Sequence, residues 1–456
     1  MKNFLKTTSL LLFILFIGII TSACGDNDSG GFDLGNGTFY YNTVEEQNDN
    51  QNNNQNNNEN TEVIANDPTN LTDTDGNTIY SGSASVNFNG TTKTINASYL
   101  IDGVDVEINS GDYSSSSGSS NQVVFLVING GSLKINGTSS NYVGINKSGS
   151  GASNGQVDDN YNFYGINSGI VVADSGSTAT IKYAEITTSS NGSNAVVATN
   201  GASINIENSI ITTTGSAGAR GLHATYNGKI TANNVDIQTN GISCASLATD
   251  RGGGTINAKN MILETNGAGS PLVYSTGTIN VTSSTGTANG AQMVVVEGGS
   301  AATITSCEFS CSGTGNRTGR SESNTASHTI DAGGIFIYQS FSGDSSNGTD
   351  YFTAKNSTFT VKTAGIPMFY ITNITAQITL NGNTFNSKNS SDYLFMLEET
   401  DQWGNVGNNG GKATVSLTNQ GVGNSLAFVG GSSSNSLTIN ATDSSSTGIT
   451  KTSATW

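Results

Sequence analysis

Charged residues, proline, histidine and cysteine are all scarce in this sequence. Its 456 residues include 3 Pro, 2 His and 4 Cys, and 11% of them are charged. So low a charge content argues against a coiled coil and against a chain kept disordered by charge repulsion. Basic residues are the scarcer charges, with 17 Lys and Arg against 34 Asp and Glu. That balance argues against nucleic-acid binding, which relies on Lys and Arg to neutralise phosphates.

Glycine and small polar residues are abundant instead. Gly accounts for 57 residues, the apolar fraction is 34%, and Ser, Thr and Asn fill much of the remainder. This composition is typical of many short strands joined by tight turns, and not of helices with stripes of Leu, Ala, Glu and Lys. We therefore expect an all-β fold.

The first 23 residues have the pattern of an export signal. Lys2 and Lys6 precede an apolar run from Leu10 to Ile20, which is too short to span a bilayer. The small residues before Cys24 resemble the lipobox of bacterial lipoproteins, although Thr21 departs from the usual Leu-like residue. The resemblance implies cleavage before Cys24 and a lipid on its thiol, and two or more acyl chains anchor a protein stably. An ordinary secretory signal is the alternative.

Residues 24–77 are expected to form a disordered tether. They have little apolar content, and the tract from Gln47 to Asn60 consists only of Asn, Gln, Asp and Glu. Such a segment buries too little apolar surface to offset its chain entropy. Its role would be to hold the folded part away from the lipid. We expect a lipid-anchored protein outside the cytoplasm, at the cell surface, with a folded domain at residues 78–456.

A short apolar strand that ends in a small polar turn and a glycine recurs along the folded region. Six successive glycines stand 21 to 27 residues apart: Gly176, Gly201, Gly228, Gly253, Gly277 and Gly298. A second strand with alternating apolar residues follows each turn, for example Ile204 to Ile211. A repeat this short does not enclose a core alone, so its copies must stack. About ten coils at a strand spacing of about 4.8 Å predict a rod about 50 Å long.

The stacked segments beginning at Arg220, Ala248, Gly269 and Ile337 resemble those of the pectin-lyase-like superfamily, particularly its adhesin-like, carbohydrate-binding members on bacterial surfaces. The resemblance covers most of the mature chain. It implies a single-stranded right-handed parallel β-helix, or solenoid. Because this fold hosts both enzymes and inert scaffolds, the resemblance says more about shape than about chemistry.

Asn and Thr recur at fixed places in the repeat. Asn at turns suits left-handed backbone geometry and side-chain ladders between coils; the examples are Asn208, Asn233, Asn234, Asn260 and Asn356. Thr recurs near the ends of the second strands, at Thr187, Thr212, Thr239 and Thr265. Ice binding by threonine rows is a weak alternative, because regular Thr-x-Thr rows are not evident.

Aligning the repeats on their turn glycines places aromatic and acidic residues at equivalent strand ends. The predicted lateral strip comprises His223, Tyr226, Asp250, Arg251, Tyr274 and Glu297, continued by Tyr338, Gln339 and Trp403. Aromatic faces that stack on sugars, flanked by groups that bond hydroxyls, favour glycan binding. The alternative is that Asp250 and Arg251 form a local ion pair at a turn and that the tyrosines are ordinary strand residues.

No cofactor is expected. Cys307 and Cys311 would lie about 13 Å apart on an extended strand, too far for a disulfide, so we expect them and Cys244 to be buried free thiols. No Cys and His spacing supports zinc. The segment from Asp73 to Asn77 has a partial likeness to a calcium loop but lacks its spacing and its closing Glu, which leaves calcium only weakly supported.

The main functional hypothesis is a surface-anchored, non-catalytic β-helix lipoprotein that binds glycans or a surface protein and contacts the membrane through its lipid. A polysaccharide lyase or related enzyme using Asp250, Arg251 and His223 is the alternative, although the clustered Asp, His and basic pair of a polygalacturonase-like hydrolase are absent. Ice binding and a passive structural rod are weaker alternatives.

Overall fold

The computed structural model describes residues 71–115, 121–149, 159–340, 343–403, 409–422, 425–442 and 450–452. The described residues are nearly all β, with 56% strand and 1% helix and with long parallel sheets, which confirms the predicted all-β class. The expected signal peptide, Cys24 and the tether up to residue 70 lie outside the described residues. Described structure begins at Leu71, which joins the main core, and Thr72 pairs with Thr78.

One long sheet contains fourteen of the described strands. They follow one another in chain order, and all neighbours are parallel except the N-terminal pair, which is antiparallel. The strands are β1 (Gly82–Phe88), β2 (Thr91–Asp102), β5 (Gln122–Ile128), β8 (Ile170–Ala173), β11 (Val196–Thr199), β13 (Leu222–Ala224), β15 (Leu247–Thr249), β18 (Val273–Ser275), β21 (Val294–Glu297), β26 (Ile335–Tyr338), β29 (Phe369–Thr372), β32 (Tyr393–Leu397), β34 (Leu426–Val429) and β36 (Thr450–Thr452).

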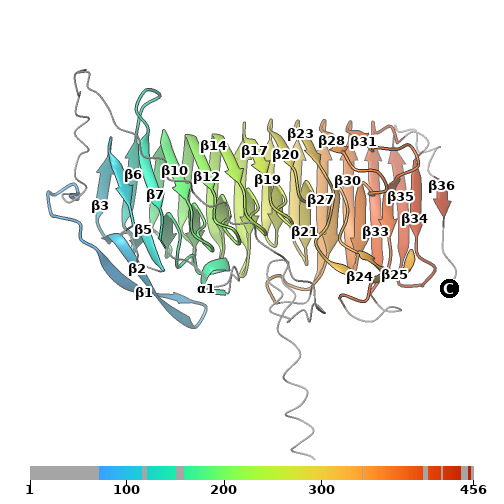
Figure 1. The fold of residues 1–456 in the computed structure, drawn as a ribbon, viewed down its shortest axis with the longest axis horizontal. Coiled ribbons are helices and arrows are strands. Elements are labelled where there is room, and N and C mark those ends of the chain that lie inside the picture. Colours follow the sequence, from blue (N-terminus) through green and yellow to red (C-terminus); the bar gives the residue numbers. More distant parts are fainter. Residues whose placement is uncertain are drawn as a thin grey trace, which may run out of the picture.

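A second sheet contains twenty described strands, which stack along the same axis (Figure 1). We call its first series panel 1: β3 (Asp105–Ile108), β6 (Ser132–Asn136), β9 (Thr178–Lys182), β12 (Ser203–Thr213), β14 (Gly228–Thr239), β16 (Gly254–Lys259), β19 (Thr278–Thr282), β22 (Ala301–Thr305), β27 (Thr349–Lys355), β30 (Ile374–Asn381), β33 (Gly411–Thr418) and β35 (Ser436–Thr442).

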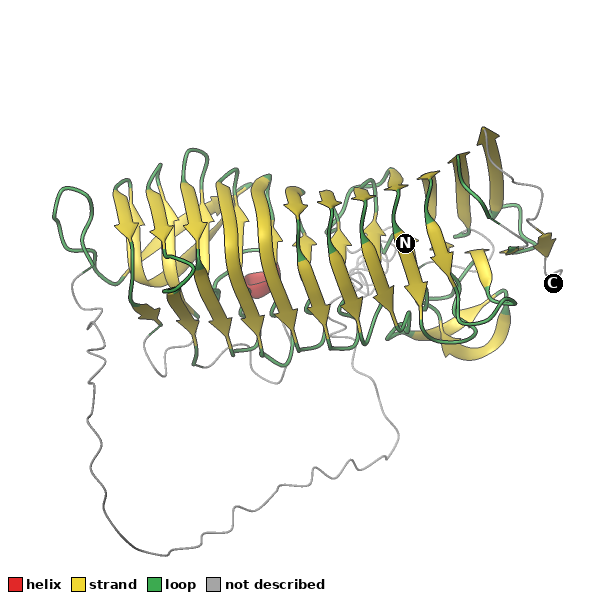
Figure 2. Ribbon diagram, turned by 90° about the horizontal axis from the view of Figure 1, so that it is seen from above, coloured by secondary structure: helices red, strands yellow, loops and turns green. Residues whose placement is uncertain are grey.

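Panel 2 of the second sheet follows most panel 1 strands beyond a corner; among the described residues, β33 and β35 have no panel 2 strand after them. The second halves of β12 and β14 belong to it, because these two long strands run through both panels. Its other strands are β4 (Asp112–Ser114), β7 (Val143–Lys147), β10 (Ala184–Thr188), β17 (Ile262–Thr265), β20 (Thr285–Ala288), β23 (Glu308–Cys311), β28 (Thr358–Val361) and β31 (Thr384–Asn386). Figure 2 shows the parallel stacking from a second direction.

Asparagine holds several of the corners between the panels. The predicted left-handed geometry is confirmed at Asn208, Asn234, Asn260 and Asn356, where φ is 51°, 56°, 56° and 49°. Asn tolerates this region better than most residues because its short polar side chain bonds locally. The predicted ladders are also present: Asn234 donates to Asn208 at 2.8 Å, and Asn260 donates to Asn233 at 2.9 Å.

The main core lies between the two sheets. Strands of the second sheet alternate buried and exposed residues, so one face joins the core and the other faces outward. The four-residue strands of the first sheet are buried on both faces, for example β8 and β26. Their outward side chains join two further apolar clusters with residues from outside the sheet. One cluster includes Phe163 and Tyr164, and the other includes Ile330 and Trp403.

Inserted segments cover that outward face of the first sheet. Helix α1 (Asp159–Asn162) and the residues after it cover the N-terminal part. The hairpin of β24 (Thr318–Ser321) and β25 (Asn324–Thr329) leads into Ile330, which packs with Trp403 over the C-terminal part. The first sheet is therefore buried between the core and these insertions.

The four threonines considered for ice binding occupy two different rows. Thr187 and Thr212 pair on the outward face, whereas Thr239 and Thr265 pair in a row with no solvent exposure. The buried row also contains Thr188 and Thr213, and each of its four hydroxyls donates to a carbonyl oxygen of the loop that follows. These threonines secure the loops and are not available to a ligand.

Candidate functional site

The predicted strip lies on the outward face of the first sheet. His223, Ala248, Tyr274, Val295 and Phe336 follow one another in register across five strands. Glu297 pairs in register with Tyr338 two residues further along the same strands, on the same face. The predicted residues therefore occupy two neighbouring rows on one face, which we call the outward line.

The side chains of this line are not on the surface, which corrects the expectation of an exposed aromatic strip. The physical reason is that the inserted segments described above cover the line. The predicted residues that are buried are His223, Tyr226, Asp250, Tyr274, Glu297, Tyr338, Gln339 and Trp403. No ring among them offers an open face for a sugar.

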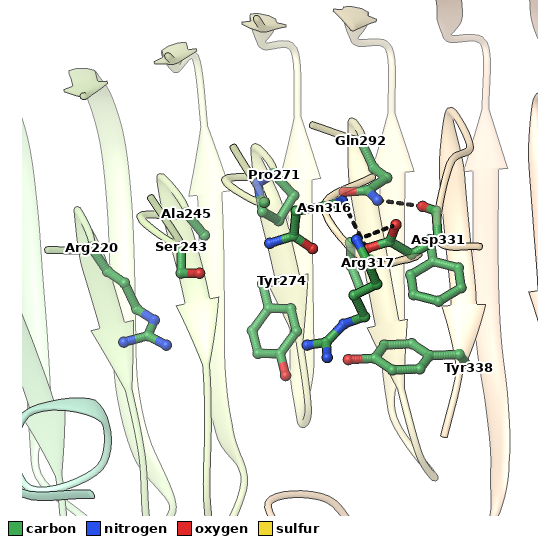
Figure 3. Close-up of a pocket in the computed structure, with 13 residues that line it drawn as sticks. Arg220, Ser243, Ala245, Pro271, Tyr274, Gln292, Asn316, Arg317, Asp331 and Tyr338 are labelled. Carbon is green, nitrogen blue, oxygen red and sulfur yellow. Dashed lines mark hydrogen bonds between the residues drawn. The ribbon is translucent and has the colours of Figure 1, made fainter. Parts of the chain in front are cut away.

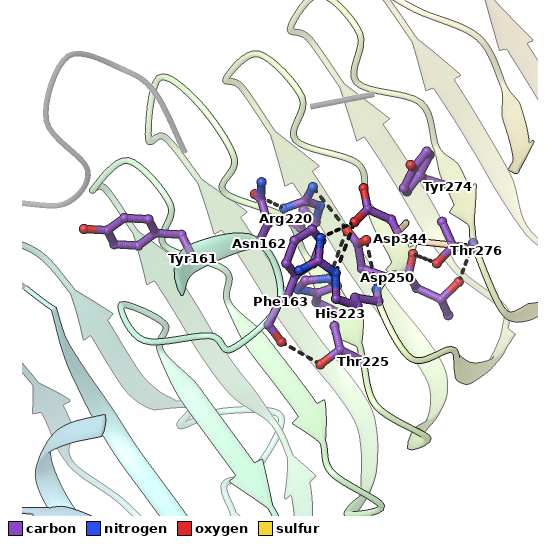
Figure 4. Close-up of polar contacts among 12 residues, drawn as sticks. Tyr161, Asn162, Phe163, Arg220, His223, Thr225, Asp250, Tyr274, Thr276 and Asp344 are labelled. Carbon is purple, nitrogen blue, oxygen red and sulfur yellow. Dashed lines mark hydrogen bonds and ion pairs between the residues drawn. The ribbon is translucent and has the colours of Figure 1, made fainter. Parts of the chain in front are cut away.

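His223 and Asp250 belong to a buried polar cluster with Arg220 (Figure 4). The Asp250 carboxylate lies 3.5 Å from the Arg220 guanidinium and 3.9 Å from Nε2 of His223. Burial, together with the Arg220 charge, holds the pKa of His223 well below its usual value. Arg220 also donates to Asn162 of α1 at 2.9 Å, so the cluster fastens the covering helix to the sheet.

Arg251 joins two insertions that are far apart in the sequence. Its guanidinium bonds Asp159 at 3.0 Å and Asp344 at 2.7 Å, and it lies over the Phe163 ring at 3.9 Å from the centroid. The predicted local pair between Asp250 and Arg251 is not the main contact, since the Arg251 side chain bonds these two other carboxylates. The proposed lyase trio thus has two buried members and one member held in ion pairs.

Glu297 is the centre of a second buried polar cluster. It accepts hydrogen bonds from the hydroxyls of Tyr274 at 2.6 Å, Tyr338 at 2.8 Å and Ser340. Burial raises the pKa of Glu297 to about 7, although the three hydroxyl bonds oppose that rise. Asp350 is also buried, and burial together with Glu297 raises its pKa well above the usual value.

The remaining predicted residues pack in structural roles. Tyr226 stacks on Tyr164 with centroids 5.8 Å apart, at the N-terminal end of the line. Trp403 packs against Tyr338 at 4.9 Å, at the C-terminal end. Gln339 bonds the loop that contains Asn347 at 3.2 Å. The structure brings Tyr274, Glu297 and Tyr338 together but keeps Tyr226 in a different cluster.

A small, partly open pocket adjoins the line between Tyr274 and Tyr338 (Figure 3). Its lining also includes Arg220, Arg317 and Asp331, a set that could bond several hydroxyls. Its volume is about 30 Å³, which is room for about one water molecule. A saccharide does not fit there without displacement of the covering segment.

An open groove lies at the turns between the first sheet and panel 1, and its volume is about 620 Å³. Gly252, Gly253, Gly254 and Gly277 belong to its floor. A Cβ atom on Gly277 would stand 2.5 Å from the Gly254 carbonyl oxygen, so the close approach of these two backbone segments requires glycine at position 277. The remaining lining is Asn227, Lys229, Thr255, Thr276, Thr278, Gly299, Gly343, Asp344, Ser345 and Ser346.

The groove has an aromatic neighbour that the sequence argument missed. Thr278 pairs with Ala301, and Ala301 pairs with Tyr351, so Tyr351 lies two strands along the same row. Two strand spacings are about 10 Å. Tyr351 is 48% exposed. The sequence signal for Tyr351 is an aromatic residue on the outward face of a strand, between the polar residues Thr349 and Thr353 of the same face.

The cysteine prediction is confirmed: Cys244, Cys307 and Cys311 are buried thiols that form no disulfide. Within the described ranges, no three His, Cys, Asp or Glu side chains come together as a metal site would require. The Asp73 carboxylate instead accepts bonds from the backbone of Asp75 and from Asn77, which closes a turn.

The described ranges contain no helix with the length and apolar character needed to cross a bilayer. Comparisons with family models, curated proteins and solved structures give no match to this chain.

Proposed function

We propose that this protein is a lipid-anchored, right-handed parallel β-helix of about ten coils that binds glycans at the cell surface without catalysis. The lipobox-like sequence before Cys24 supports the anchor, and the Asn-rich segment after it supports a tether. The alternation of strands between two long parallel sheets supports the helical solenoid and its likeness to the pectin-lyase-like superfamily.

The open groove is the observation that carries the proposal. Its lining provides hydroxyl, amide and ammonium groups from Thr255, Thr278, Asn227 and Lys229. Exposed backbone at the floor glycines adds further hydrogen-bonding groups, and a chain of hydroxyls is the ligand chemistry that matches them. A volume of about 620 Å³ accommodates a small saccharide.

Catalysis is not part of the proposal because the candidate acid-base residues lack access to a ligand. His223 and Asp250 are buried, and neither contributes to the groove. A lyase requires a base within hydrogen-bond reach of the proton it removes.

A glycan array tests the binding function. We would probe it with the full-length chain in mild detergent, with and without calcium, and expect a saccharide signal above background. A blank array in both conditions would contradict glycan binding.

Groove variants locate the binding site. Thr278→Trp fills the groove and is expected to weaken binding about tenfold or more. Thr414→Trp is the matched control, because Thr414 occupies the same row on β33 but does not line the groove. Equal losses in the two variants would show that the ligand does not bind in the groove.

Tyr351 tests whether the ligand extends along the row. Stacking of a sugar on its ring predicts that Tyr351→Ala weakens binding of longer saccharides and that Tyr351→Phe preserves it. The measurement is titration calorimetry with a length series of the saccharide found on the array. Unchanged affinity of Tyr351→Ala for every length would exclude the stacking role.

A further inference from the structure

A basic row crosses panel 1 of the outer face. Lys259 pairs with Thr282, Thr282 with Thr305, and Thr305 with Lys355, so the two lysines stand three strand spacings apart. That separation is about 14 Å. Both lysines are exposed, and two small hydroxyl residues lie between them.

An acidic row of the same length crosses panel 2. Asp236 pairs with Ile262, Ile262 with Thr285, and Thr285 with Glu308. The two carboxylates are therefore also three strand spacings apart, and both are exposed. Ile262 between them is 57% exposed, which adds an apolar contact surface.

The charges of these two rows have no ion partner within the described chain, in contrast to the lysines nearer the N-terminus. Lys134 bonds Glu107 at 3.2 Å, and Lys182 bonds Glu207, each on a neighbouring strand. Around Lys355, the adjacent row members are the uncharged Thr305 and Asn381. Lys182 and Glu207 belong to the same row as Lys259, through Asn233, so this row is ion-paired in the first coils and is not ion-paired at Lys259 and Lys355.

We propose that the basic row of one molecule binds the acidic row of a second copy of this chain. The charged pairs in the two rows have the same separation because both rows follow the same strand spacing, so both lysines meet carboxylates together. In each copy the two rows run along the two sides of one corner, because Lys259 and Ile262, like Thr305 and Glu308, are three residues apart. The contact of a basic row with an acidic row is heterologous. Rods anchored by their lipid would therefore associate side by side.

The net charge of −17 does not prevent this association. At about 0.15 M ionic strength the Debye length is about 8 Å, so repulsion between the bodies of two molecules is screened while charges in contact still attract. Exposed ion pairs are individually weak, and we expect association to require the high local concentration of an anchored protein. High salt should abolish the association, because the Debye length falls to about 3 Å at about 1 M salt.

Zero-length cross-linking tests the contact directly. Full-length chain would be reconstituted in phosphatidylcholine vesicles as a mixture of isotope-labelled and unlabelled copies, and a carbodiimide would join amines to carboxylates in direct contact. We expect peptides that link Lys259 or Lys355 of one copy to Asp236 or Glu308 of another. Absence of these mixed-isotope links at high surface density would overturn the proposal.

Charge-reversal variants distinguish specific pairing of the two rows from a general effect of net charge on association. The pair Lys259→Glu and Lys355→Glu, or the pair Asp236→Lys and Glu308→Lys, should each reduce the cross-links at least tenfold, and their combination in one chain should restore them. The matched control is Lys388→Glu with Lys412→Glu, which makes the same charge change at two exposed lysines outside the row. Equal loss in the control, or no recovery in the combined variant, would contradict the pairing of the rows.

Discussion

The outward face of the first sheet and the outward face of the second sheet are built from the same stacked repeat, yet they differ in what they leave accessible. The first carries Tyr274, Glu297 and Tyr338, residues typical of ligand sites, and insertions bury them. The second carries mainly Thr, Asn, Ser and Lys, and much of it is exposed. Accessibility, more than residue type, separates a candidate surface from a structural layer in this fold.

The largest expected difference between the two faces concerns a matched pair of tyrosines. Tyr338 is buried and bonded to Glu297, whereas Tyr351 is half exposed on the adjacent outer face. We expect Tyr338→Ala to lower the free energy of unfolding by about 3–5 kcal/mol, because it removes a packed ring and leaves a cavity. Tyr351→Ala should lower it by less than about 1 kcal/mol.

Urea unfolding followed by tyrosine and tryptophan fluorescence measures both effects. Equal destabilisation in the two variants would contradict the distinction between a structural face and an accessible face. Tyr338→Phe is a finer control, because it keeps the ring and removes only the hydroxyl bond to Glu297.

The second prediction concerns the pH dependence contributed by the buried face. The pKa of Glu297 is raised to about 7 in the folded protein from an ordinary value of 4.5. The folded state therefore holds this proton more tightly than the unfolded state. Its contribution to stability is fully present below pH 4.5 and is lost as pH rises through about 7.

The size of that loss is about 3 kcal/mol, from about 1.36 kcal/mol for each pKa unit. Glu297→Gln removes the titration, so the free energy of unfolding of this variant should fall less between pH 4.5 and 8. Urea midpoints measured across this range check the slope. Identical slopes in the wild type and the variant would show that Glu297 does not titrate in this window.

The third prediction compares two arginines that each bond an aspartate. The side chain of Arg251 is 29% exposed and joins Asp159 to Asp344, whereas that of Arg320 is 67% exposed and bonds Asp401. We expect Arg251→Ala to cost about 2–3 kcal/mol, because it leaves the buried Asp344 carboxylate without its cation. Arg320→Ala should cost less than about 1 kcal/mol.

Hydrogen exchange adds a local readout to that comparison. Loss of Arg251 should increase exchange in the segments around Asp159 and Asp344, since both are held by this side chain. Exchange that rises equally throughout the rod would instead indicate general destabilisation.

The sequence predicted the repeat because strand period and turn chemistry are local properties. The apolar alternation of Ile204 and Ile206 and the turn at Asn208 depend only on near neighbours and on the next coil. Register along the outward line was predictable only approximately, because repeat length varies. His223 and Ala248 each stand five residues before a turn glycine, but Tyr274, which pairs with Ala248, stands three before its glycine.

Burial of that line was not predictable from the same periodicity. The segments that cover it, such as α1 and the β24–β25 hairpin, are insertions that break the repeat, and their docking depends on long-range contacts. The groove has the same origin, because its wall at Asp344 and Ser345 comes from a long connection while its floor comes from repeat glycines. A repeat alignment therefore locates strand ends but does not reveal which side remains open.

The smallest expected effect belongs to the corners of the exposed sheet, where Asn234 has a φ of 56° and donates to Asn208. Asn234→Ala should cost about 1–2 kcal/mol, because a residue with a Cβ atom and no local side-chain bond is disfavoured in this left-handed region. Asn234→Gly relieves that strain and should cost less, although it loses the ladder bond and gains freedom in the unfolded chain. Urea midpoints of the two variants measure the difference. If glycine destabilises the protein as much as alanine does, then the ladder bond between coils, and not the corner geometry, is what Asn234 contributes to the exposed face.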